Sequence, residues 1–233
     1  MTGKLWGIGV GPGDPELLTL KAVRLLGEVD VVASLAADGR DRIARTIVAP
    51  YLPPGQHELL FAAPMRADRA TRETFYDEVA EKLATQLDAG LQVGFLCLGD
   101  PLFYGSFVNL LARLGGRYPC AVIPGITAMS AAAAAIGTPL AHGSESVAVL
   151  PGTLPDAELV RRLESAEVAV ILKLGQHLPR IRRLLERQGL VGCTWIASEL
   201  GSPRERVSRL ADWRHEAAPY MSLLLLRRQA PGP

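Results

Sequence analysis

The first feature that suggests chemistry is a glycine-rich turn near the amino terminus, residues 7–15, with the sequence GIGVGPGDP. It overlaps the end of a short apolar segment, Leu5–Val10, that is typical of a buried strand. A strand-to-helix turn rich in glycine lets the backbone approach a ligand closely and presents free amide groups to it. The turn is therefore a candidate ligand-binding loop.

A dinucleotide fingerprint is the obvious interpretation of this turn, but its spacing does not fit. In the pattern GxGxxG, the third glycine would fall on Pro12 if the pattern began at Gly7. If it began at Gly9, that glycine would fall on Asp14. Proline removes an amide donor that a pyrophosphate would use, and an acidic side chain would repel the phosphates. Asp38 resembles the acid that binds the ribose in such enzymes, but it does not restore the missing glycine of the loop. An enzyme that uses NAD is therefore disfavoured.

Two further loops lie at the ends of predicted strands, at residues 98–106 (LGDPLFYGS) and 124–128 (PGITA). Ligands of open α/β sheets bind outside the carboxyl ends of the strands, which is where both loops fall. Each loop also has a purely structural interpretation, because Pro101 can begin a helix and Thr127 can cap one. One loop alone does not decide between the two, but three such loops favour a shared ligand site.

The cysteines and histidines show no pattern that would hold a metal. The three cysteines are far apart and form no CxxC pair, and the four histidines show no HExxH or similar spacing. We therefore predict no metal, no disulfide framework and a reducing cytosol as the location. The residues concerned are Cys97, Cys120, Cys193, His57, His142, His177 and His215.

Composition and charge are those of an ordinary globular protein. The 233 residues are 48% hydrophobic and 21% charged with a formal net charge of +1, so neither a nucleic acid nor an anionic membrane is indicated as a partner. No apolar run approaches the ~18–20 residues that cross a bilayer, and no signal peptide is recognisable, which predicts a soluble, cytoplasmic protein. Beyond Leu150, 13 Lys and Arg outnumber 9 Asp and Glu, which suits either an anionic small molecule or a solvated helix surface.

Apolar runs and helical patterns alternate in the first half of the chain. With Asp14 as its cap and Pro15 as its first residue, a helix is predicted to run to Leu26 and to end at Gly27. Strand–helix–strand alternation indicates a doubly wound α/β layer with a parallel sheet. The predicted strands are Leu5–Val10, Val29–Ala33, Leu91–Leu96 and Cys120–Ile123, and the other predicted helices are Arg69–Asp88 and Phe103–Leu114.

A second α/β sheet is predicted in the remainder of the chain. The best candidate hinge is the segment 115–117 (GGR), so the sequence predicts one α/β domain over residues 1–117 and another over residues 118–233. The predicted strands of the second domain are Ser146–Leu150, Val168–Leu172, Thr194–Ala197 and Met221–Leu226, and its predicted helices are Pro155–Glu164 and Leu178–Gln188.

Taken together, the three loops make the chain recognisable. The pattern GxGxGPGDPE near the start, followed by GDPLFYGS and PGITA, resembles the tetrapyrrole (corrin/porphyrin) methylase family from Leu5 to about Leu226. Within the family, residues 103–107 (FYGSF) and 219–223 (PYMSL) resemble the members that methylate carbon 20 of precorrin-2. The resemblance implies two α/β domains, the methyl donor S-adenosylmethionine in the cleft between them, and a homodimer.

The resemblance also assigns the donor site residue by residue. It implies that Pro12 lines the site and that residues 98–100 contact the methionine and ribose portions of the donor. From the second domain, it implies that Leu174 covers the adenine and that Gly201 adds backbone contacts. The donor-binding residues implied in this way are Pro12, Leu98, Gly99, Asp100, Phe103, Thr127, Ala128, Leu174 and Gly201.

The substrate that the resemblance implies is a multiply carboxylated tetrapyrrole, for which basic side chains are natural partners. The main task of the protein is then to align reacting atoms ~3–3.5 Å apart, so we assign no catalytic base. For each basic residue, an exposed surface charge is the alternative interpretation. The candidate substrate-binding residues are Asp14, Arg40, Arg42, Arg45, Arg66, Tyr104 and Lys173.

The sequence departs from the carbon-20 enzymes at two places. Leu98 stands where those enzymes usually carry an acid, and residues 197–200 (ASEL) also differ from their usual pattern. The open alternatives are a family enzyme that acts on a cobalt-bearing ring or on uroporphyrinogen III, and, more distantly, a donor-binding module without catalytic activity.

Overall fold

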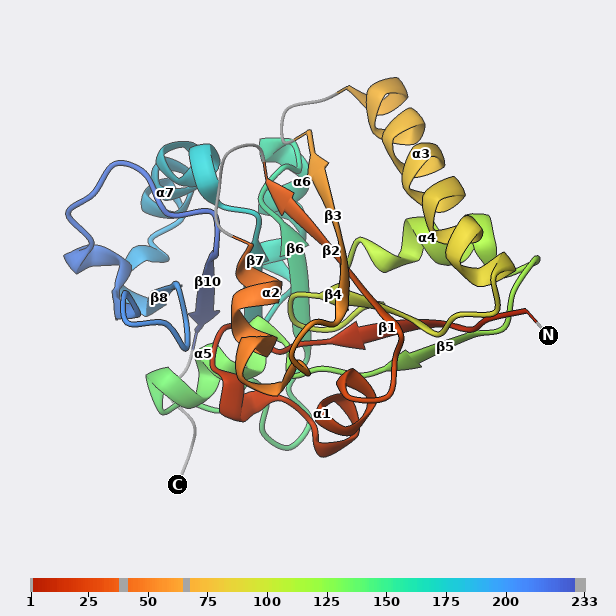
Figure 1. Ribbon diagram of the computed structural model, residues 1–233. Helices are drawn as coiled ribbons and strands as arrows, with labels where there is room; N and C mark the ends of the chain where they lie inside the picture. Colours follow the sequence, from red (N-terminus) through yellow and green to blue (C-terminus); the bar gives the residue numbers. More distant parts are fainter. Residues whose placement is uncertain (1, 38–41, 65–67, 229–233) are drawn as a thin grey trace. The chain divides into compact units, whose positions relative to one another are not determined.

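The computed structural model describes residues 2–37, 42–64 and 68–228. The chain forms two compact units, Met1–Thr127 and Ala128–Pro233, each built around one β-sheet (Figure 1). The expected architecture of two α/β domains is therefore confirmed.

The sheet of the first unit is entirely parallel, with the strand order β3-β2-β4-β1-β5. Because all carboxyl ends of a parallel sheet lie at one edge, the loops that follow β1, β4 and β5 share that edge. These three strands are neighbours, so the three loops found in the sequence lie next to one another. The strands are β1 (Leu5–Gly9), β2 (Val31–Ala37), β3 (His57–Ala63), β4 (Val93–Cys97) and β5 (Cys120–Ile123).

Helices cover both faces of this sheet, as in a doubly wound fold (Figure 1). The helices α1 (Leu20–Leu26) and α2 (Ile43–Val48) pack on one face, where Ile8 and Val32 are buried. The helices α3 (Arg69–Asp88) and α4 (Phe107–Leu114) pack on the other face. Each contributes an apolar stripe to the buried core, as amphipathic helices do.

Two predicted helices begin later than the sequence suggested. Asp14 caps only a 3₁₀ turn, Pro15–Leu17, whereas Thr19 caps α1 by accepting a hydrogen bond from the Ala22 amide at 3.2 Å. The helix expected from Phe103 begins at Phe107, because Tyr104 has a left-handed backbone, with φ of 56°, which an α-helix excludes.

Helix α2 and strand β3 were not predicted from the sequence. Strand β3 is an edge strand that pairs only with β2, and most of its residues are exposed or half-buried. It therefore lacks the continuous apolar run by which the central parallel strands are recognised.

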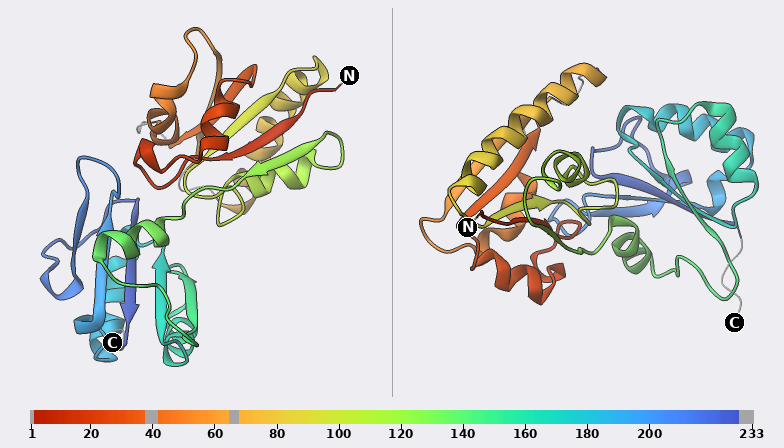
Figure 2. Two further views of the ribbon diagram at one scale, coloured as in Figure 1. Left: turned by 90° about the horizontal axis from the view of Figure 1, so that it is seen from below. Right: turned by 90° about the vertical axis from the view of Figure 1, so that its right-hand side faces the viewer.

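The sheet of the second unit is mixed, with the order β6-β7-β10-β8-β9. Strand β10 is antiparallel to both of its neighbours, while β6 and β7 are parallel. The helix α5 (Ala128–Ile136) packs on one face, and α6 (Asp156–Glu164) and α7 (Leu178–Arg187) pack on the other (Figure 2). The strands are β6 (Val147–Pro151), β7 (Val168–Leu172), β8 (Thr194–Ser198), β9 (Arg206–Arg209) and β10 (Ser222–Arg227).

The boundary between the units lies between Thr127 and Ala128, ten residues beyond the predicted division at 117/118. Strand β5 pairs with β1, so the first sheet is complete only at Ile123. The glycines at 115 and 116 follow the end of α4, where Gly115 is the C-cap, and they do not link the units. The third loop consequently belongs to the first unit.

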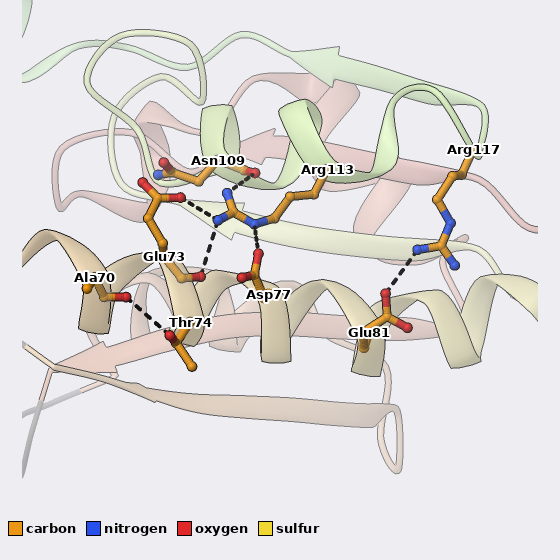
Figure 3. Close-up of polar contacts among 8 residues, drawn as sticks. All are labelled: Ala70, Glu73, Thr74, Asp77, Glu81, Asn109, Arg113 and Arg117. Carbon is orange, nitrogen blue, oxygen red and sulfur yellow. Dashed lines mark hydrogen bonds and ion pairs between the residues drawn. The ribbon is translucent and has the colours of Figure 1, made fainter.

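An ion-pair network joins α3 to α4 on the surface of the first unit (Figure 3). Arg113 Nε lies 2.7 Å from Asp77 Oδ1, and Arg113 Nη2 lies 2.5 Å from Glu73 Oε2. The same guanidinium donates to the Asn109 and Glu73 carbonyl oxygens. Arg117 pairs with the Glu81 carboxylate at 3.0 Å.

We expect Arg113→Gln to lower the free energy of unfolding by about 1 kcal/mol, since two ion pairs are lost together. Arg117→Gln is the matched control, because its side chain is 49% exposed against 19% for Arg113. Urea denaturation at low salt measures both, and the difference should shrink at 1 M salt, where exposed charges are screened. Equal effects of the two substitutions would contradict the larger contribution to stability that we assign to Arg113.

Candidate functional site

The loops after β1 and β4 are joined backbone to backbone. The Gly99 amide donates to the Gly11 carbonyl oxygen at 2.8 Å, and the Gly11 amide donates to the Gly99 carbonyl oxygen at 3.4 Å. The Val10 amide also donates to the Cys97 carbonyl oxygen at 2.9 Å. The parallel pairing of the two strands therefore passes into an antiparallel bridge between the loops that follow them.

The loop after β5 packs against both of the others through glycine. A Cβ atom on Gly125 would lie 2.1 Å from the Gly99 carbonyl oxygen, and a Cβ atom on Gly9 would lie 2.6 Å from the Gly125 amide nitrogen. No side chain fits at either position. These two glycines are needed because the loops touch one another, whether or not a ligand approaches them.

Gly99 is required for a different reason. Its φ is 65°, in the left-handed region, and a Cβ atom there would meet no described atom nearer than 3.9 Å. A Cβ atom at Gly99 would therefore not clash, so the left-handed backbone is what favours glycine here, while its carbonyl and amide groups are held by the other loops. A half-buried backbone without a side chain can be approached closely by a ligand.

Asp100 ties the second loop to the third. Its Oδ2 accepts a hydrogen bond from the Gly125 amide at 3.1 Å, and its Oδ1 accepts one from the Leu102 amide at 2.8 Å. Hydrogen bonds to an ionised carboxylate are stronger than those between neutral groups. Asp100 therefore positions the backbone of two loops, whatever further contact it makes with a ligand.

The aromatic pair that follows Asp100 is held in an uncommon conformation. The rings of Phe103 and Tyr104 meet edge to face with their centroids 5.1 Å apart, and the Tyr104 backbone has φ of 56°. A non-glycine residue in this region is strained, and such residues cluster at functional sites. The Tyr104 side chain is among the large apolar groups that remain exposed.

The thiol of Cys97, the last residue of β4, is inert by its surroundings. Burial raises the pKa of Cys97 to about 12, although hydrogen bonds from Phe107 and Ser106 lower it in part. A thiol with so high a pKa is protonated at neutral pH and is a poor nucleophile. Cys97 therefore belongs to the packing beneath the second loop and not to its chemistry.

The structure places the remaining predicted donor-binding residues in different surroundings. Pro12 is buried in the first loop, and Leu98 is half-buried in the second. Thr127 and Ala128 stand at the junction of the two units. In the second unit, Leu174 is fully buried in the core cluster that includes Leu178, so its predicted contact with the adenine stays a prediction. Gly201, also predicted from the second unit, has φ of 72°, and its amide donates to Glu205.

The predicted substrate-binding residues that the structure describes lie in different local surroundings. The Asp14 carboxylate accepts from the Glu16 amide at 2.8 Å and so caps the turn that follows it. Arg42 is exposed, just before α2, and Lys173 is exposed, directly after β7, with φ of 59°. Arg40 and Arg66 lie outside the described residues.

Arg45 is already bound to a carboxylate. Its Nε and Nη2 atoms both lie 2.8 Å from the oxygens of Glu58, the second residue of β3. The hydrogen bonds from Arg45 hold the pKa of the Glu58 carboxyl below its ordinary value. Glu58 lies in the amino-terminal half of its strand, away from the edge that carries the three loops.

The part of the chain that the structure describes shows neither a cluster of metal-binding side chains nor a membrane-spanning helix. No group of three or more His, Cys, Asp and Glu side chains there is arranged to hold a metal ion. No helix there is long and apolar enough to cross a membrane.

Comparison with known sequences decides the family. Residues 4–211 match the family model for Tetrapyrrole (Corrin/Porphyrin) Methylases. The chain belongs to the tetrapyrrole methylase family. The three interlocked loops are thus features of a tetrapyrrole methylase, as the resemblance of their sequences implied.

Two curated relatives match nearly all of this methylase. One is the "Cobalamin biosynthesis protein CobIJ" of Mycobacterium tuberculosis, with 44% identity over 98% of this chain and 47% of that protein. The chain therefore spans about half the length of that relative. The other is the "Precorrin-2 C(20)-methyltransferase" of a Sinorhizobium species, with 43% identity over 96% of this chain and 95% of that protein.

A solved structure also resembles this methylase along its length. It is the uroporphyrin-III C-methyl transferase of Thermus thermophilus in complex with S-adenyl homocysteine, which is 28% identical. The TM-score is 0.71, and the match covers 97% of this chain and 92% of that one.

Sequence reasoning missed the structural role of Gly9 and Gly125. Both were visible in the motifs, and both stand where an apolar strand ends. Which loops touch depends on the strand order β4-β1-β5, which no local pattern encodes. The glycines were therefore interpreted only as a place for a ligand.

We expect Gly125→Ala to lower the free energy of unfolding by roughly 2–3 kcal/mol, because the new methyl group collides with backbone that cannot move independently. Gly116→Ala is the control, since a Cβ atom there would meet nothing within 4 Å. Its effect should stay within about 0.5 kcal/mol. Urea denaturation of both variants measures the difference, and a Gly125→Ala variant as stable as the control would show that the loops are not interlocked.

Proposed function

We propose that this tetrapyrrole methylase transfers a methyl group from S-adenosylmethionine to carbon 20 of precorrin-2. The observation that carries the proposal is the likeness to the Sinorhizobium carbon-20 enzyme over nearly the full length of both chains. The intact loops after β1, β4 and β5 support catalysis over a role as a mere scaffold.

The edge formed by the three loops fits the proposed donor. It offers backbone amide and carbonyl groups for polar substituents, and Leu98 and Phe103, both half-buried, provide apolar surface. Hydrogen bonds from the Gly125 and Leu102 amides occupy the Asp100 carboxylate, so that its charge is spread into the loops. The donor supplies a methyl group on a positively charged sulfur, and loss of that charge is favoured at a weakly polar surface.

In this proposal, the residues of the loops align the donor with the substrate and exclude water from the reacting atoms. Gly99 permits close approach, Asp100 fixes the loops, and Phe103 packs on the donor. Alignment of two reactants supplies a large part of the rate enhancement without an acid or a base. The donor-binding residues expected from the resemblance, including Pro12, Thr127, Ala128, Leu174 and Gly201, are proposed here in the same roles.

The residues that would contact the substrate are likewise proposed from the family resemblance. Tyr104 offers an exposed ring beside the donor loops, and Arg42 and Lys173 offer exposed cations. Arg45 is less suited, since its guanidinium is engaged by Glu58. A homodimer is the assembly that the family resemblance predicts.

The first test concerns the donor. S-adenosylhomocysteine should bind with micromolar affinity, and NAD should not bind, because Asp14 occupies the turn where a pyrophosphate would lie. Titration calorimetry measures both. Saturable binding of NAD, without binding of S-adenosylhomocysteine, would remove the basis of the proposal.

The second test concerns the position of the methyl group. With donor labelled by carbon-13 in its methyl group, the product of precorrin-2 should carry one label, at carbon 20, as seen by carbon NMR. Uroporphyrinogen III should remain unmethylated. Label at carbon 2 or carbon 7 would assign the family's earlier reaction, and label at carbon 20 only with a cobalt-bearing ring would assign the cobalt-dependent route.

A further inference from the structure

A row of polar residues crosses three strands at one edge of the second unit. Ser198, the last residue of β8, pairs in register with Ser222 of β10 and with Arg206 of β9. Residues directly opposite each other on antiparallel strands point to the same face of a sheet. Ile196 shares that face, because it lies two residues from Ser198, and it packs in one core cluster with Trp213. The guanidinium, two hydroxyls and an indole ring therefore lie on one face.

The buried members of this group lack hydrogen-bond partners. Ser198 is 0% exposed, Trp213 5% and Ser222 8%. Among the described residues, neither serine hydroxyl nor the Trp213 indole N–H has a partner. A buried polar group without a partner costs roughly 1–3 kcal/mol, so its retention calls for an explanation. An indole N–H only donates and a hydroxyl can donate, which suits an anionic oxygen.

A surface pocket adjoins this row, and one of the two carboxylates in its lining is paired with an arginine from outside the pocket. Arg206, Trp213 and Arg214 line it together with the acids Glu199 and Glu216. Glu199 is already paired, at 2.9 Å, with an arginine outside the lining, Arg204. The lining thus contains two guanidinium groups and one carboxylate, that of Glu216, without an ion pair in the described part of the chain.

The two arginines of the pocket differ from most of the other arginines that the structure describes. Arg24, for example, pairs with Glu28, and Arg227 pairs with Glu145. In the described residues, neither Arg206 nor Arg214 has a carboxylate within 4.0 Å. Arg206 Nη1 lies 3.1 Å from His215 Nε2 and, since guanidinium only donates, this nitrogen accepts. Both arginines therefore remain available to an anion.

The pocket lies at the edge of the sheet that also carries the second unit's predicted donor-binding residues. Strands β7 and β8 are each antiparallel to β10, so their carboxyl ends point the same way. Glu199, of the pocket, directly follows β8, and Gly201 comes two residues later. Leu174 follows β7 at the same edge. A molecule that reacts with the donor would therefore present its periphery near this pocket.

We propose that the pocket is an anion subsite that binds one carboxylate of the tetrapyrrole substrate. Arg206 and Arg214 supply the positive charge, and the Trp213 indole N–H supplies a buried donor. The identity of the ligand rests on the proposed function, whereas the preference for a carboxylate rests on the donors named here. Planar guanidinium groups match a carboxylate in geometry as well as charge.

The test uses the stable, dehydrogenated form of precorrin-2, which keeps every carboxylate, as a probe in calorimetry. Arg206→Gln and Arg214→Gln should each weaken its binding about tenfold, and Trp213→Phe about threefold, since the ring stays and only the N–H is lost. Arg161→Gln is the matched control, an exposed arginine on α6 paired with Glu158. It should change the affinity less than about twofold, and circular dichroism checks that all variants are folded.

The carboxylate bound in the pocket could belong to the substrate or to the methionine portion of the donor, and binding of S-adenosylhomocysteine distinguishes the two. It should be unchanged in the pocket variants, and an equal loss would place the pocket in the donor site and overturn the proposal. Unchanged probe affinity in both arginine variants, a loss equal to that of Arg161→Gln, or a wild-type chain that does not bind the probe would also overturn it. If the arginine variants bind the probe more weakly but the wild-type chain does not methylate carbon 20, the proposed function is rejected and the carboxylate subsite is still supported.

Discussion

The candidate site depends on one contact, the approach of the Gly99 carbonyl oxygen to the backbone at Gly125. The approach is so close that a single methyl group on Gly125 would lie 2.1 Å from that oxygen. Gly9 completes the contact from the first loop, and the Asp100 carboxylate secures it with a hydrogen bond from the Gly125 amide. The backbones of the three loops are therefore held against one another. The loop residues around Gly99 take their positions from this contact.

The contact is possible because three neighbouring parallel strands end together. In the order β4-β1-β5, the central strand carries the first loop, and the loops of its neighbours close over it from both sides. Strand β4 is buried along its whole length, and helices cover both faces of the sheet. A buried parallel sheet is a stiff support, so the loops need little side-chain reinforcement. Asp100 supplies the side-chain hydrogen bond that joins the second loop to the third.

The two units offer chemically different surfaces. The loop edge of the first unit is mostly backbone and apolar surface, which suits a reaction in which a positive charge is lost. The proposed subsite of the second unit is built from side chains, with Arg206 and Arg214 beside the buried Trp213. In the proposed reaction, the first surface aligns the methyl donor and the second recognises a carboxylate. Neither role calls for a nucleophilic side chain of the protein, consistent with the high pKa of Cys97.

The sequence alone determined the class of fold and the position of the three glycine-containing loops. Continuous apolar runs predicted the central strands, such as Val168–Leu172, and the loop motifs identified the family, because both are local patterns. Tertiary structure decided what such patterns do not encode. The exposed edge strand β3 has no apolar signal, and the unit boundary moved to Thr127 because β5 pairs with a strand more than 100 residues away. The meeting of Gly9, Gly99 and Gly125, and the alignment of Ser198 with Arg206, depend on strand order and register, and these are set by packing across the whole sheet.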